Sequence, residues 1–403
     1  MNNPIVDYYI SSSHNTYLTD HQLYGKSSEE MYAKVLTEGC RCVELDCWNS
    51  DDNKPNRPII YHGYTRTTKI DFESVIDTIN KNAFTNSEYP VILSIENHCN
   101  KENQTRMAQI MKDIFGEKLV TELVDGQKCP TPNQLKNKII VKAKKLPEDE
   151  KALVEESGDE DETEIDKSSK EYKKKKEVKL SPELSKLVIY NRARHFKDFK
   201  DAKEKSTCHH ISSFAEGKVV KTAKLDEGYL GFVKHTNFQM VRTYPAGFRV
   251  NSDNYDPVTP WALGCQVVAL NWQTNDTSQL INISKFKMNG GKGWVLKPEN
   301  IRNGKPWTSN MKNLRIQVMS GNQLPRGTDK NDVVDPYVTI DLYDYNPDDI
   351  KVDGKIVSKD TNMIKNNGWN PEWNTEKDLI QFEKVNPDTG FLVLKVKDKD
   401  KYN

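Results

Sequence analysis

Short apolar runs alternate with helical patterns over the first 145 residues. Runs at 5–10, 41–48, 58–63, 90–97 and 138–145 have the length and composition of strands. Residues 71–84 place Phe72, Val75, Ile76 and Ile79 on one helical face, and a second helix is predicted over 103–116. An earlier helix is predicted between a capping box of Ser27 and Glu30 and a stop at Gly39. This βα alternation predicts a parallel sheet covered by helices.

The same kind of pattern resumes later in the chain. Further strands are predicted at 187–190, 238–245, 265–272 and 293–298. Neither half shows a domain boundary of its own. The two halves are therefore predicted to form one α/β domain, a TIM (β/α)8 barrel that is interrupted between its halves.

From residue 314 the apolar positions alternate strictly, which predicts the antiparallel strands of an all-β sandwich. This region has only about 90 residues where such sandwiches have roughly 100, so we expect it to be truncated. The alternating sets are Leu314, Ile316 and Val318; Val338, Ile340 and Leu342; and Leu392, Leu394 and Val396.

Residues 147–179 combine an acidic block with a lysine block and have few apolar positions, which predicts a disordered linker. The expected organisation is therefore a first barrel half at 1–146, the linker at 147–179, a second half at 180–302, a connector at 303–313 and the sandwich at 314–403.

Charge is distributed unevenly along the chain. The 59 basic and 59 acidic residues give a formal net charge of zero. Residues 148–166 hold 11 acids and one lysine, so the remainder has 58 basic against 48 acidic residues. A basic body suits an anionic membrane surface. We expect the acidic block to restrain activity away from a membrane, while the lysines that follow it oppose that effect.

Other features of composition narrow the class of protein. No apolar run approaches the roughly 18 residues of a membrane-spanning helix, and the first ten residues lack the pattern of a signal peptide. The seven cysteines include no CxxC pair, which favours free thiols in the cytosol. Cys208, His209 and His210 are adjacent, but no fourth metal ligand is evident.

Polar residues collect where the predicted strands end, which is where a parallel barrel places its active site. They are His14 and Asn15 after the first strand, Glu44 and Asp46 on the second, His62 after the third, Glu96 on the fourth, and Lys142 and Lys144 on the fifth.

Glu44 and Asp46 are two residues apart on a strand and therefore face the same side. Two buried acids would repel each other unless a cation lay between them. With Glu96 and the Asn15 amide the ligands are all oxygen, which favours calcium or magnesium over zinc. The alternative is that the two acids pair with Arg41 or a lysine.

His14 and His62 are then available for proton transfer and charge stabilisation. Lys142 and Lys144, together with Arg242, form a basic group suited to phosphates. A cation site, two histidines and a basic pocket together indicate phosphoester cleavage on a polyphosphorylated substrate.

Seven motifs in order resemble eukaryotic phosphoinositide-specific phospholipase C, most strongly the delta type. They are SSSHNTYL (11–18), ELDCW (44–48), YHGYT (61–65), ENHC (96–99), KAKKL (142–146), ELSKLVIY (183–190) and RTYPAGFRV (242–250). They correspond to the X and Y halves of a split catalytic barrel. DPYVTIDL (335–342) and NNGWNPEWN (366–374) resemble the C2 domain that follows.

The resemblance implies a role for each matching residue. Asn15, Glu44, Asp46 and Glu96 would hold a catalytic calcium ion, and His14 would stabilise the transition state. His62 would be the general acid and Glu44 the base, and the reaction would pass through a cyclic phosphodiester. Lys142, Lys144, Ser213 and Arg242 would bind the 4- and 5-phosphates, with Tyr244 stacked on the inositol ring.

The resemblance also implies surfaces for membranes and calcium. Leu23, Tyr64, Val220 and Phe248 fall at the positions of an apolar membrane ridge, in which Arg66 replaces an aromatic residue. In the C2 domain Asp335, Asp398 and Asp400 match calcium-binding aspartates. The amino-terminal PH and EF-hand regions of the delta type have no counterpart here, for which we expect a truncated chain or partial gene model; a naturally minimal form is the alternative.

The function so implied is calcium-dependent hydrolysis of phosphatidylinositol 4,5-bisphosphate to inositol 1,4,5-trisphosphate and diacylglycerol in intracellular signalling. We expect a cytoplasmic monomer that associates peripherally with anionic membranes and binds no nucleic acid. The sequence leaves the upstream regulator open.

Three other functions agree less well with these residues. An inactive phosphoinositide-binding scaffold is disfavoured because His14, His62 and the four candidate ligands are all present. A phosphodiesterase acting on soluble glycerophosphodiesters would not need Lys142, Lys144 and Arg242. Nucleic-acid binding rests only on the lysine run 173–176, which has Tyr172 as its one stacking aromatic.

Overall fold

The computed structural model describes residues 1–50, 57–126, 129–146, 180–225, 227–305, 307–326, 333–345, 355–373 and 378–399. The chain divides into two compact units, residues 1–305 and 306–403. The predicted linker at 147–179 and Asp400 lie outside the described residues. Within the described part of the chain, no helix is both long enough and apolar enough to cross a bilayer.

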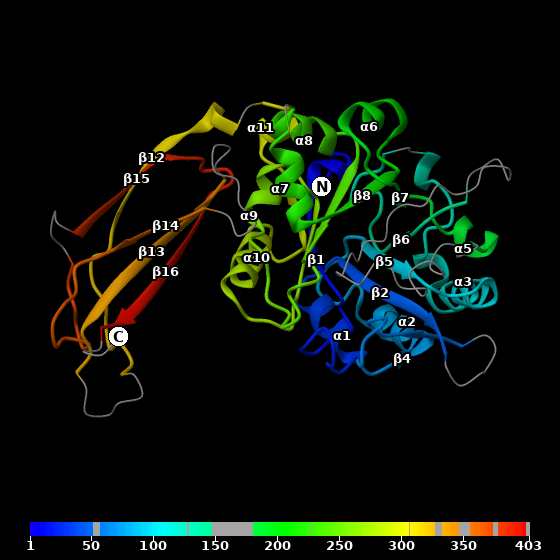
Figure 1. Cartoon of the computed structure of the whole chain (residues 1–403), viewed down its shortest axis with the longest axis horizontal. Coiled ribbons are helices and arrows are strands. Elements are labelled where there is room, and N and C mark those ends of the chain that lie inside the picture. The colour runs from blue at the N-terminus through cyan, green and yellow to red at the C-terminus, as the bar shows by residue number, and fades with distance from the viewer. Residues whose placement is uncertain are drawn as a thin grey trace. The chain divides into compact units, whose positions relative to one another are not determined.

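The first unit contains a closed ring of parallel strands, which confirms the predicted barrel (Figure 1). Each strand pairs in parallel with the next, and the last pairs with the first. In this ring the two halves meet at two places, an isolated parallel bridge between Ala143 and Arg192 and the parallel pairing of residues 10–13 with residues 267–270. In the described residues the ring consists of β1 (Tyr8–Ser13), β2 (Cys42–Asn49), β5 (Val91–Asn97), β6 (Ile139–Lys142), β7 (Arg192–Ala193), β8 (His210–Ala215), β9 (Met240–Tyr244) and β10 (Val267–Leu270).

Two predicted barrel strands lie outside the ring. The run at 58–63 forms β3 (Pro58–Ile60), which pairs antiparallel with β2 and then with the short β4 (Ile70–Asp71). The run at 293–298 forms β11 (Trp294–Leu296), antiparallel to β1. Both runs are apolar because they pack on the barrel, and periodicity alone does not distinguish such strands from those of the ring.

Two further predictions were wrong in the second half. Residues 187–190 form no strand; they follow the short helix α5 (Pro182–Lys186), and their apolar side chains are buried in turns. The strand β8 was missed because its sequence, HISSFA, mixes polar and apolar residues on both faces: Ile211 and Ser213 face inward, and Ser212 and Phe214 face outward. Without a regular alternation of apolar and polar residues, such a strand cannot be told from a loop by its sequence.

Helices surround the barrel strands (Figure 1). On α2 the predicted face of Phe72, Val75, Ile76 and Ile79 is buried, and the Asp71 side chain caps the helix by accepting from the Ser74 amide. The helices of this unit are α1 (Glu30–Thr37), α2 (Phe72–Asn82), α3 (Lys101–Phe115), α5, α6 (Phe199–Lys205), α7 (Glu216–Ala223), α8 (Gly228–Thr236), α9 (Val258–Ala262), α10 (Thr277–Lys287) and α11 (Glu299–Arg302).

The predicted capping box of α1 is absent from the structure. The Ser27 hydroxyl donates to the Thr68 carbonyl oxygen instead, and Glu29 occupies the N-cap position without a side-chain bond. The predicted stop is confirmed, because Gly39 has a φ of +99°, a conformation that ends helices and favours glycine.

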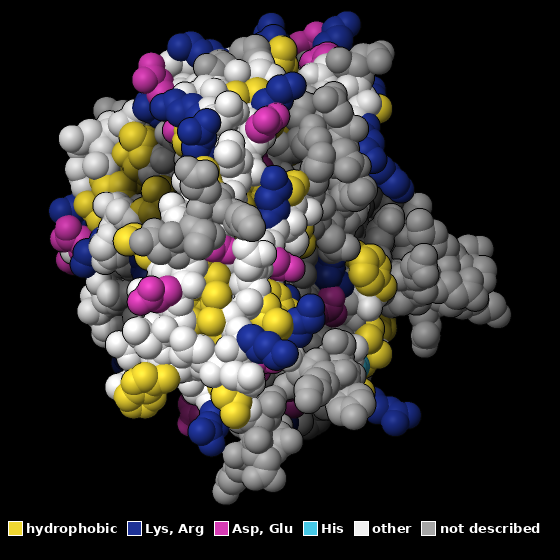
Figure 2. Space-filling view, turned by 90° about the vertical axis from the view of Figure 1, so that its left-hand side faces the viewer, with side chains coloured by type: hydrophobic (Ala, Val, Ile, Leu, Met, Phe, Trp, Pro, Cys, Tyr) yellow, Lys and Arg dark blue, Asp and Glu magenta, His cyan; other side chains and the backbone are white. Residues whose placement is uncertain are grey.

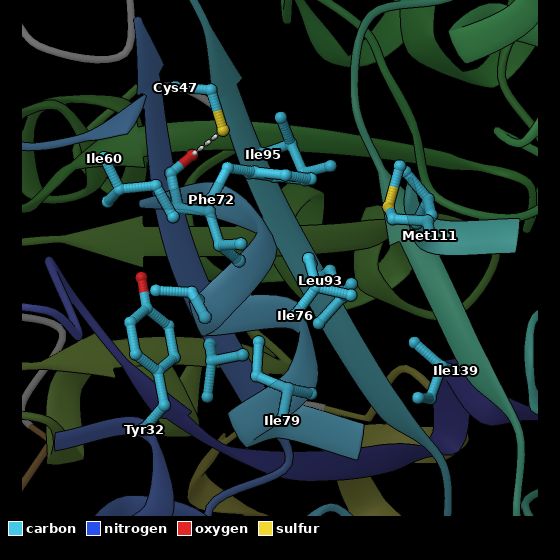
Figure 3. Close-up of a cluster of buried hydrophobic side chains, with 14 of the residues drawn as sticks. Tyr32, Cys47, Ile60, Phe72, Ile76, Ile79, Leu93, Ile95, Met111 and Ile139 are labelled. Carbon is cyan, nitrogen blue, oxygen red and sulfur yellow. Dashed lines mark hydrogen bonds between the residues drawn. The ribbon is translucent and has the colours of Figure 1, made fainter. Parts of the chain in front are cut away.

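The buried apolar side chains of the barrel form two clusters, one outside the ring of strands and one inside it. The outer cluster joins the strands to the helices, and Figure 3 shows Leu93 and Ile95 of β5 beside Phe72 and Ile76 of α2. The inner cluster includes residues from seven of the eight described ring strands, and one from each of these strands contributes to an apolar layer inside the barrel. The residues of this layer are Ile10, Cys42, Ile92, Ile140, Ile211, Met240 and Val267.

The second unit has the antiparallel strands predicted for it. β12 (Lys312–Gln317) pairs with β15 (Leu379–Val385), and β13 (Pro336–Asp344) lies between β14 (Lys355–Asp360) and β16 (Phe391–Asp398). Val338, Ile340 and Leu342 are buried in its core, as predicted. Leu392, Leu394 and Val396 lie directly opposite them on the same face, but they are exposed, since β16 is an edge strand of its described sheet.

Surface charges of both signs are mixed. On the face drawn in Figure 2, lysine and arginine side chains alternate with acidic ones, and hydrophobic side chains occur between them. Cys40, Cys42, Cys47, Cys99 and Cys265 are buried thiols of the described core.

Candidate active site

The candidate site residues continue the inward-facing rows of the barrel. Moving two residues along a strand keeps the same face, so Glu44 and Asp46 follow Cys42, and Lys142 follows Ile140. Strand pairing aligns these residues between strands: Glu44 is level with Ser94 and Ser94 with Lys142, Asp46 is level with Glu96, and Ser213 is level with Arg242. The apolar layer therefore forms a floor beneath polar residues at the C-terminal ends of the strands.

Glu44, Asp46 and Glu96 come together at this end of the barrel. Each contributes a carboxylate oxygen, and these atoms lie within 4.8 Å of one another. Glu44 and Asp46 are buried and Glu96 is half-buried. Among the described residues no other group of three acidic, histidine or cysteine side chains meets this condition.

The carboxylates have defined partners. Arg242 Nη2 donates to Glu44 Oε1 at 2.5 Å, the Asn15 amide donates to Glu44 Oε2 at 2.9 Å, and the Tyr17 hydroxyl donates to Asp46 Oδ2 at 2.5 Å. Arg41 does not face them; its guanidinium donates to main-chain carbonyl oxygens that include those of Leu36 and Ala83. The alternative that Glu44 and Asp46 pair with Arg41 is therefore excluded, and Arg242 is the counter-charge to Glu44.

The residues fit a hard divalent cation. Arg242 pairs with Glu44 and His98 Nε2 lies 2.6 Å from Glu96 Oε1, and the atoms that the three carboxylates offer to a ligand are all oxygen. Calcium accepts six to eight such ligands in flexible geometry. Asn15, bonded to Glu44 through its main chain, can add its side-chain oxygen; its φ of +40° is a conformation that asparagine tolerates better than most residues.

Both candidate histidines are buried and bonded through Nδ1. The His14 nitrogen lies 2.9 Å from Asn271 Oδ1, and the His62 nitrogen lies 2.7 Å from the main-chain oxygen of Gln22. A carbonyl oxygen only accepts, so Nδ1 of His62 carries a hydrogen. Nε2 is thus the nitrogen of each ring that can gain or lose a proton during a reaction.

His62 reaches the site from a different element than the sequence predicts. It follows the antiparallel strand β3 and not a ring strand. β3 runs back along β2, and the Tyr61 amide bonds the Asp46 carbonyl oxygen, so His62 returns to the level of the carboxylates.

The basic residues come from both barrel halves. Lys142 is buried on β6, whereas Lys144 is exposed just beyond it. The Arg242 guanidinium lies 5.0 Å from the centre of the Tyr244 ring. Ser213 on β8 is paired with Arg242 in register, which brings it to the same row.

The candidate ridge residues differ in exposure. Leu23, Tyr64 and Phe248 are exposed, and so is Arg66, whose amide bonds the Leu23 carbonyl oxygen. Val220, in contrast, is buried on α7. Three of the four residues therefore present apolar surface to solvent.

The C2 aspartates are held by local hydrogen bonds. Asp335 Oδ1 accepts from the Asn366 amide, and Asp398 Oδ1 accepts from the Asp335 amide. The third residue, Asp400, lies outside the described part of the chain.

Several residues around the site are not among the site residues predicted from the sequence. Tyr17 bonds Asp46, and Gln22 and Asn271 bond the histidines and Asn15. Asn271 follows β10 directly, so the strand-end rule that selected Glu96 could have found it. Gln22 lies in an irregular loop, where no periodic pattern marks it.

Comparison with known proteins gives matches over most of the chain. Residues 1–145 match the family described as phosphatidylinositol-specific phospholipase C, X domain, residues 184–300 match its Y domain, and residues 312–403 match the C2 domain. The sequence is 41% identical to human 1-phosphatidylinositol 4,5-bisphosphate phosphodiesterase delta-1 over 99% of this chain and 54% of that protein. The mouse delta-3 protein is 39% identical, with 99% and 51% covered.

Solved structures show the same resemblance. PLC21 from L. pealei superimposes with a TM-score of 0.81 at 35% sequence identity, covering 99% of this chain and 50% of that one. PLC21 from S. officinalis gives the same values. The chain spans about half the length of these relatives.

Proposed function

Because the chain belongs to the family of phosphatidylinositol-specific phospholipases C, we propose that it hydrolyses phosphatidylinositol 4,5-bisphosphate to inositol 1,4,5-trisphosphate and diacylglycerol. The reaction would require calcium and take place at the surface of an anionic membrane. The observation that carries this proposal is the carboxylate group of Glu44, Asp46 and Glu96 at the same barrel end as Lys142, His14 and His62.

In this proposal calcium is held by the side chains of Asn15, Glu44, Asp46 and Glu96. The bound ion would make the inositol 2-hydroxyl more acidic and offset charge on the phosphate. The hydrogen bonds to Glu44 and Asp46 hold the carboxylates in place while leaving further oxygen lone pairs for a ligand.

The protein groups then move two protons. Glu44 accepts the proton of the 2-hydroxyl as its oxygen attacks phosphorus, and His62 donates a proton to the departing diacylglycerol oxygen as the phosphorus–oxygen bond breaks. The attack is intramolecular and forms a cyclic phosphodiester. His62 then takes a proton from the water that opens the ring, and Glu44 returns its proton to the inositol 2-oxygen as the bond between that oxygen and phosphorus breaks. His14, held by Asn271, would stabilise negative charge that develops on the phosphate oxygens.

The basic residues would select the substrate. Lys142, Lys144 and Ser213 would bind the ring phosphates, and Arg242 would add those of its N–H groups that do not bond Glu44. Tyr244, beside Arg242, would contact the inositol ring. The exposed Leu23, Tyr64 and Phe248 would contact lipid next to the site. We expect the enzyme to work as a monomer that associates peripherally with membranes; calcium binding by Asp335, Asp398 and Asp400 of the C2 domain is a separate proposal.

The test is an assay of inositol trisphosphate release from vesicles that contain phosphatidylinositol 4,5-bisphosphate, with calcium or a chelator. We expect chelation to abolish turnover, and His62→Ala to lower kcat by about 10²–10⁴-fold. His209→Ala is the matched control, because His209 precedes β8 at the opposite end of the barrel. Turnover that persists without calcium, or vesicle binding without turnover, would contradict the proposal.

A further inference from the structure

Gln22 lies at the centre of a hydrogen-bond network that joins three of the candidate site residues. It is buried in the loop that follows β1. Its main-chain oxygen accepts from His62 Nδ1 at 2.7 Å, and its side-chain Oε1 accepts from Asn15 Nδ2 at 2.8 Å. Its Nε2 donates to Asn271 Oδ1 at 3.2 Å, the same oxygen that bonds His14.

The direction of each bond in this network is fixed by main-chain carbonyl oxygens. The Ser252 hydroxyl donates to the Asp20 oxygen, so it accepts from Gln22 Nε2, at 2.9 Å. Asn271 Nδ2 donates to the Asp253 oxygen, which turns Asn271 Oδ1 towards Gln22 Nε2. Since carbonyl oxygens only accept, Gln22 must present Nε2 to this side and Oε1 to Asn15.

The orientation of Gln22 in turn determines the orientation of Asn15. An asparagine side chain has an oxygen at one end of its amide and an NH₂ group at the other, and the two ends have nearly the same shape. Because Gln22 Oε1 accepts a hydrogen bond, the Asn15 NH₂ group faces Gln22. The other end of the Asn15 amide, Oδ1, can then face a cation. A reversed Asn15 amide would instead direct its N–H groups towards the cation.

We propose that Gln22 is a positioning residue that holds the Asn15 amide with its oxygen towards the calcium ion. The inference rests on the proposed function for its choice of cation and deepens it. Residues that orient metal ligands typically change metal affinity by 10–100-fold when they are replaced. Gln22 acts on calcium only through Asn15, so its removal should weaken calcium binding without removing a ligand.

The experiment compares Gln22→Met with Gln22→Glu in the full chain. Methionine keeps the length of the side chain but replaces the strong acceptor Oε1, so Asn15 is free to reverse. Glutamate keeps an oxygen acceptor for Asn15 Nδ2. Calcium binding is measured by titration calorimetry and by the rise in melting temperature with calcium, and Asp46→Asn supplies the background from sites outside the barrel.

We expect Gln22→Met to raise the dissociation constant of the barrel site at least about tenfold and Gln22→Glu to leave it no weaker than in the unchanged protein. Gln273→Met is the matched control, because Gln273 bonds the same Asp20 carbonyl oxygen but contacts none of the site residues in the bonds described above. It should bind calcium normally.

Equal weakening in the two Gln22 variants would overturn the inference, because it would show that the acceptor for Asn15 is not what matters. An unchanged dissociation constant in Gln22→Met would overturn it as well. If Gln22→Met does not fold, Gln22→Glu still decides, since weakened calcium binding there contradicts the proposal and normal binding supports it. Failure of the proposed function is seen separately, as absent turnover in a chain that binds calcium.

Discussion

The Arg242 guanidinium and the Glu44 carboxylate form a buried ion pair, with Nη2 of Arg242 2.5 Å from Oε1 of Glu44. Arg242 belongs to β9 in the second barrel half and Glu44 to β2 in the first. The pair therefore links the two halves across the inside of the barrel, and it supplies positive charge to a group of three carboxylates.

Replacing Arg242 should make the protein depend more on calcium for its stability. Arg242→Met leaves Glu44 buried without its counter-charge, which typically costs about 3–5 kcal/mol of the free energy of unfolding. A bound cation would return positive charge to the same oxygens. We therefore expect calcium to raise the melting temperature of the variant by more degrees than that of the unchanged protein.

The comparison uses thermal unfolding with calcium and with a chelator. Lys144→Met is the control, because it removes an exposed cation just beyond β6, a strand that pairs with neither β9 nor β2. Equal calcium-dependent increments in Arg242→Met and the unchanged protein would mean that the arginine does not act as the counter-charge.

Phe248 should contribute to membrane binding without contributing much to stability. Its side chain is 72% exposed, and inserting an exposed phenylalanine into lipid is worth about 1.5–3 kcal/mol. Phe248→Ser should therefore reduce partitioning onto anionic vesicles by roughly tenfold or more, as measured by co-sedimentation, while the melting temperature changes little.

Met288 offers a matched control for this measurement. It is 74% exposed and follows α10, whose C-terminal end lies at the other end of the barrel from the site. If Met288→Ser reduces vesicle binding as much as Phe248→Ser does, the effect comes from general surface hydrophobicity and the ridge assignment is wrong.

Lys297 should make stability depend on pH above neutrality. Its ammonium group is buried, with Nζ bonded to the Thr236 carbonyl oxygen at 2.9 Å, and burial lowers its pKa to about 7 from the ordinary 10.5. Between these two values the unfolded chain binds the proton and the folded protein does not. The free energy of unfolding therefore rises as the pH increases through this window.

Lys297→Met should remove about half of the combined dependence of Lys297 and Lys285 and raise the melting temperature at pH 7. Thermal unfolding of both proteins from pH 6 to pH 9 measures the effect. A variant that keeps the slope of the unchanged protein would show that another group is responsible, of which the buried Lys285, with its pKa also lowered to about 7 by burial, is the next to replace.

Cys208 should be the first cysteine to react with an alkylating reagent at neutral pH. A hydrogen bond from the Cys129 thiol lowers the pKa of Cys208, while the same bond raises the pKa of Cys129. A lower pKa gives more thiolate at pH 7, and the thiolate is the reactive form. Mass spectrometry after brief treatment with iodoacetamide should find modification at Cys208 before Cys129.

Cys129→Ala removes the donor and should slow alkylation of Cys208 at pH 7. Cys265 is buried, its pKa is raised to about 12 by burial, and its rate should stay low in both proteins. A rate at Cys208 that is unaffected by Cys129→Ala would contradict the assignment of the hydrogen bond as the cause.

The inward-facing site residues were accessible from the sequence because strand alternation is a local property. Glu44 and Asp46 interrupt an otherwise apolar strand at a spacing of two, and this alone places both on the inside. The same reasoning failed for β8, where polar and apolar residues are mixed on both faces of the strand. It selected His62 but assigned the strand before it to the ring, because a run of three apolar residues does not reveal whether its strand joins the ring or folds back on β2.

The pairing of Glu44 with Arg242 was beyond sequence reasoning. The two residues are 198 positions apart, and their contact depends on the closure of the barrel. Gln22 was missed for a related reason: its role comes from four hydrogen bonds made by an irregular loop, and neither composition nor periodicity marks such a position.

The hairpin of β2 and β3 has a consequence for how the site tolerates change. Asn49 is paired with Pro58 and Cys47 with Ile60, so the spacing between Asp46 and His62 is set by strand register. Insertions between residues 50 and 57 would leave this register, and with it the distance from Asp46 to His62, unchanged. A single residue inserted after Ile60 would instead shift His62 out of line. Loop length and catalytic spacing can therefore vary independently on this side of the barrel.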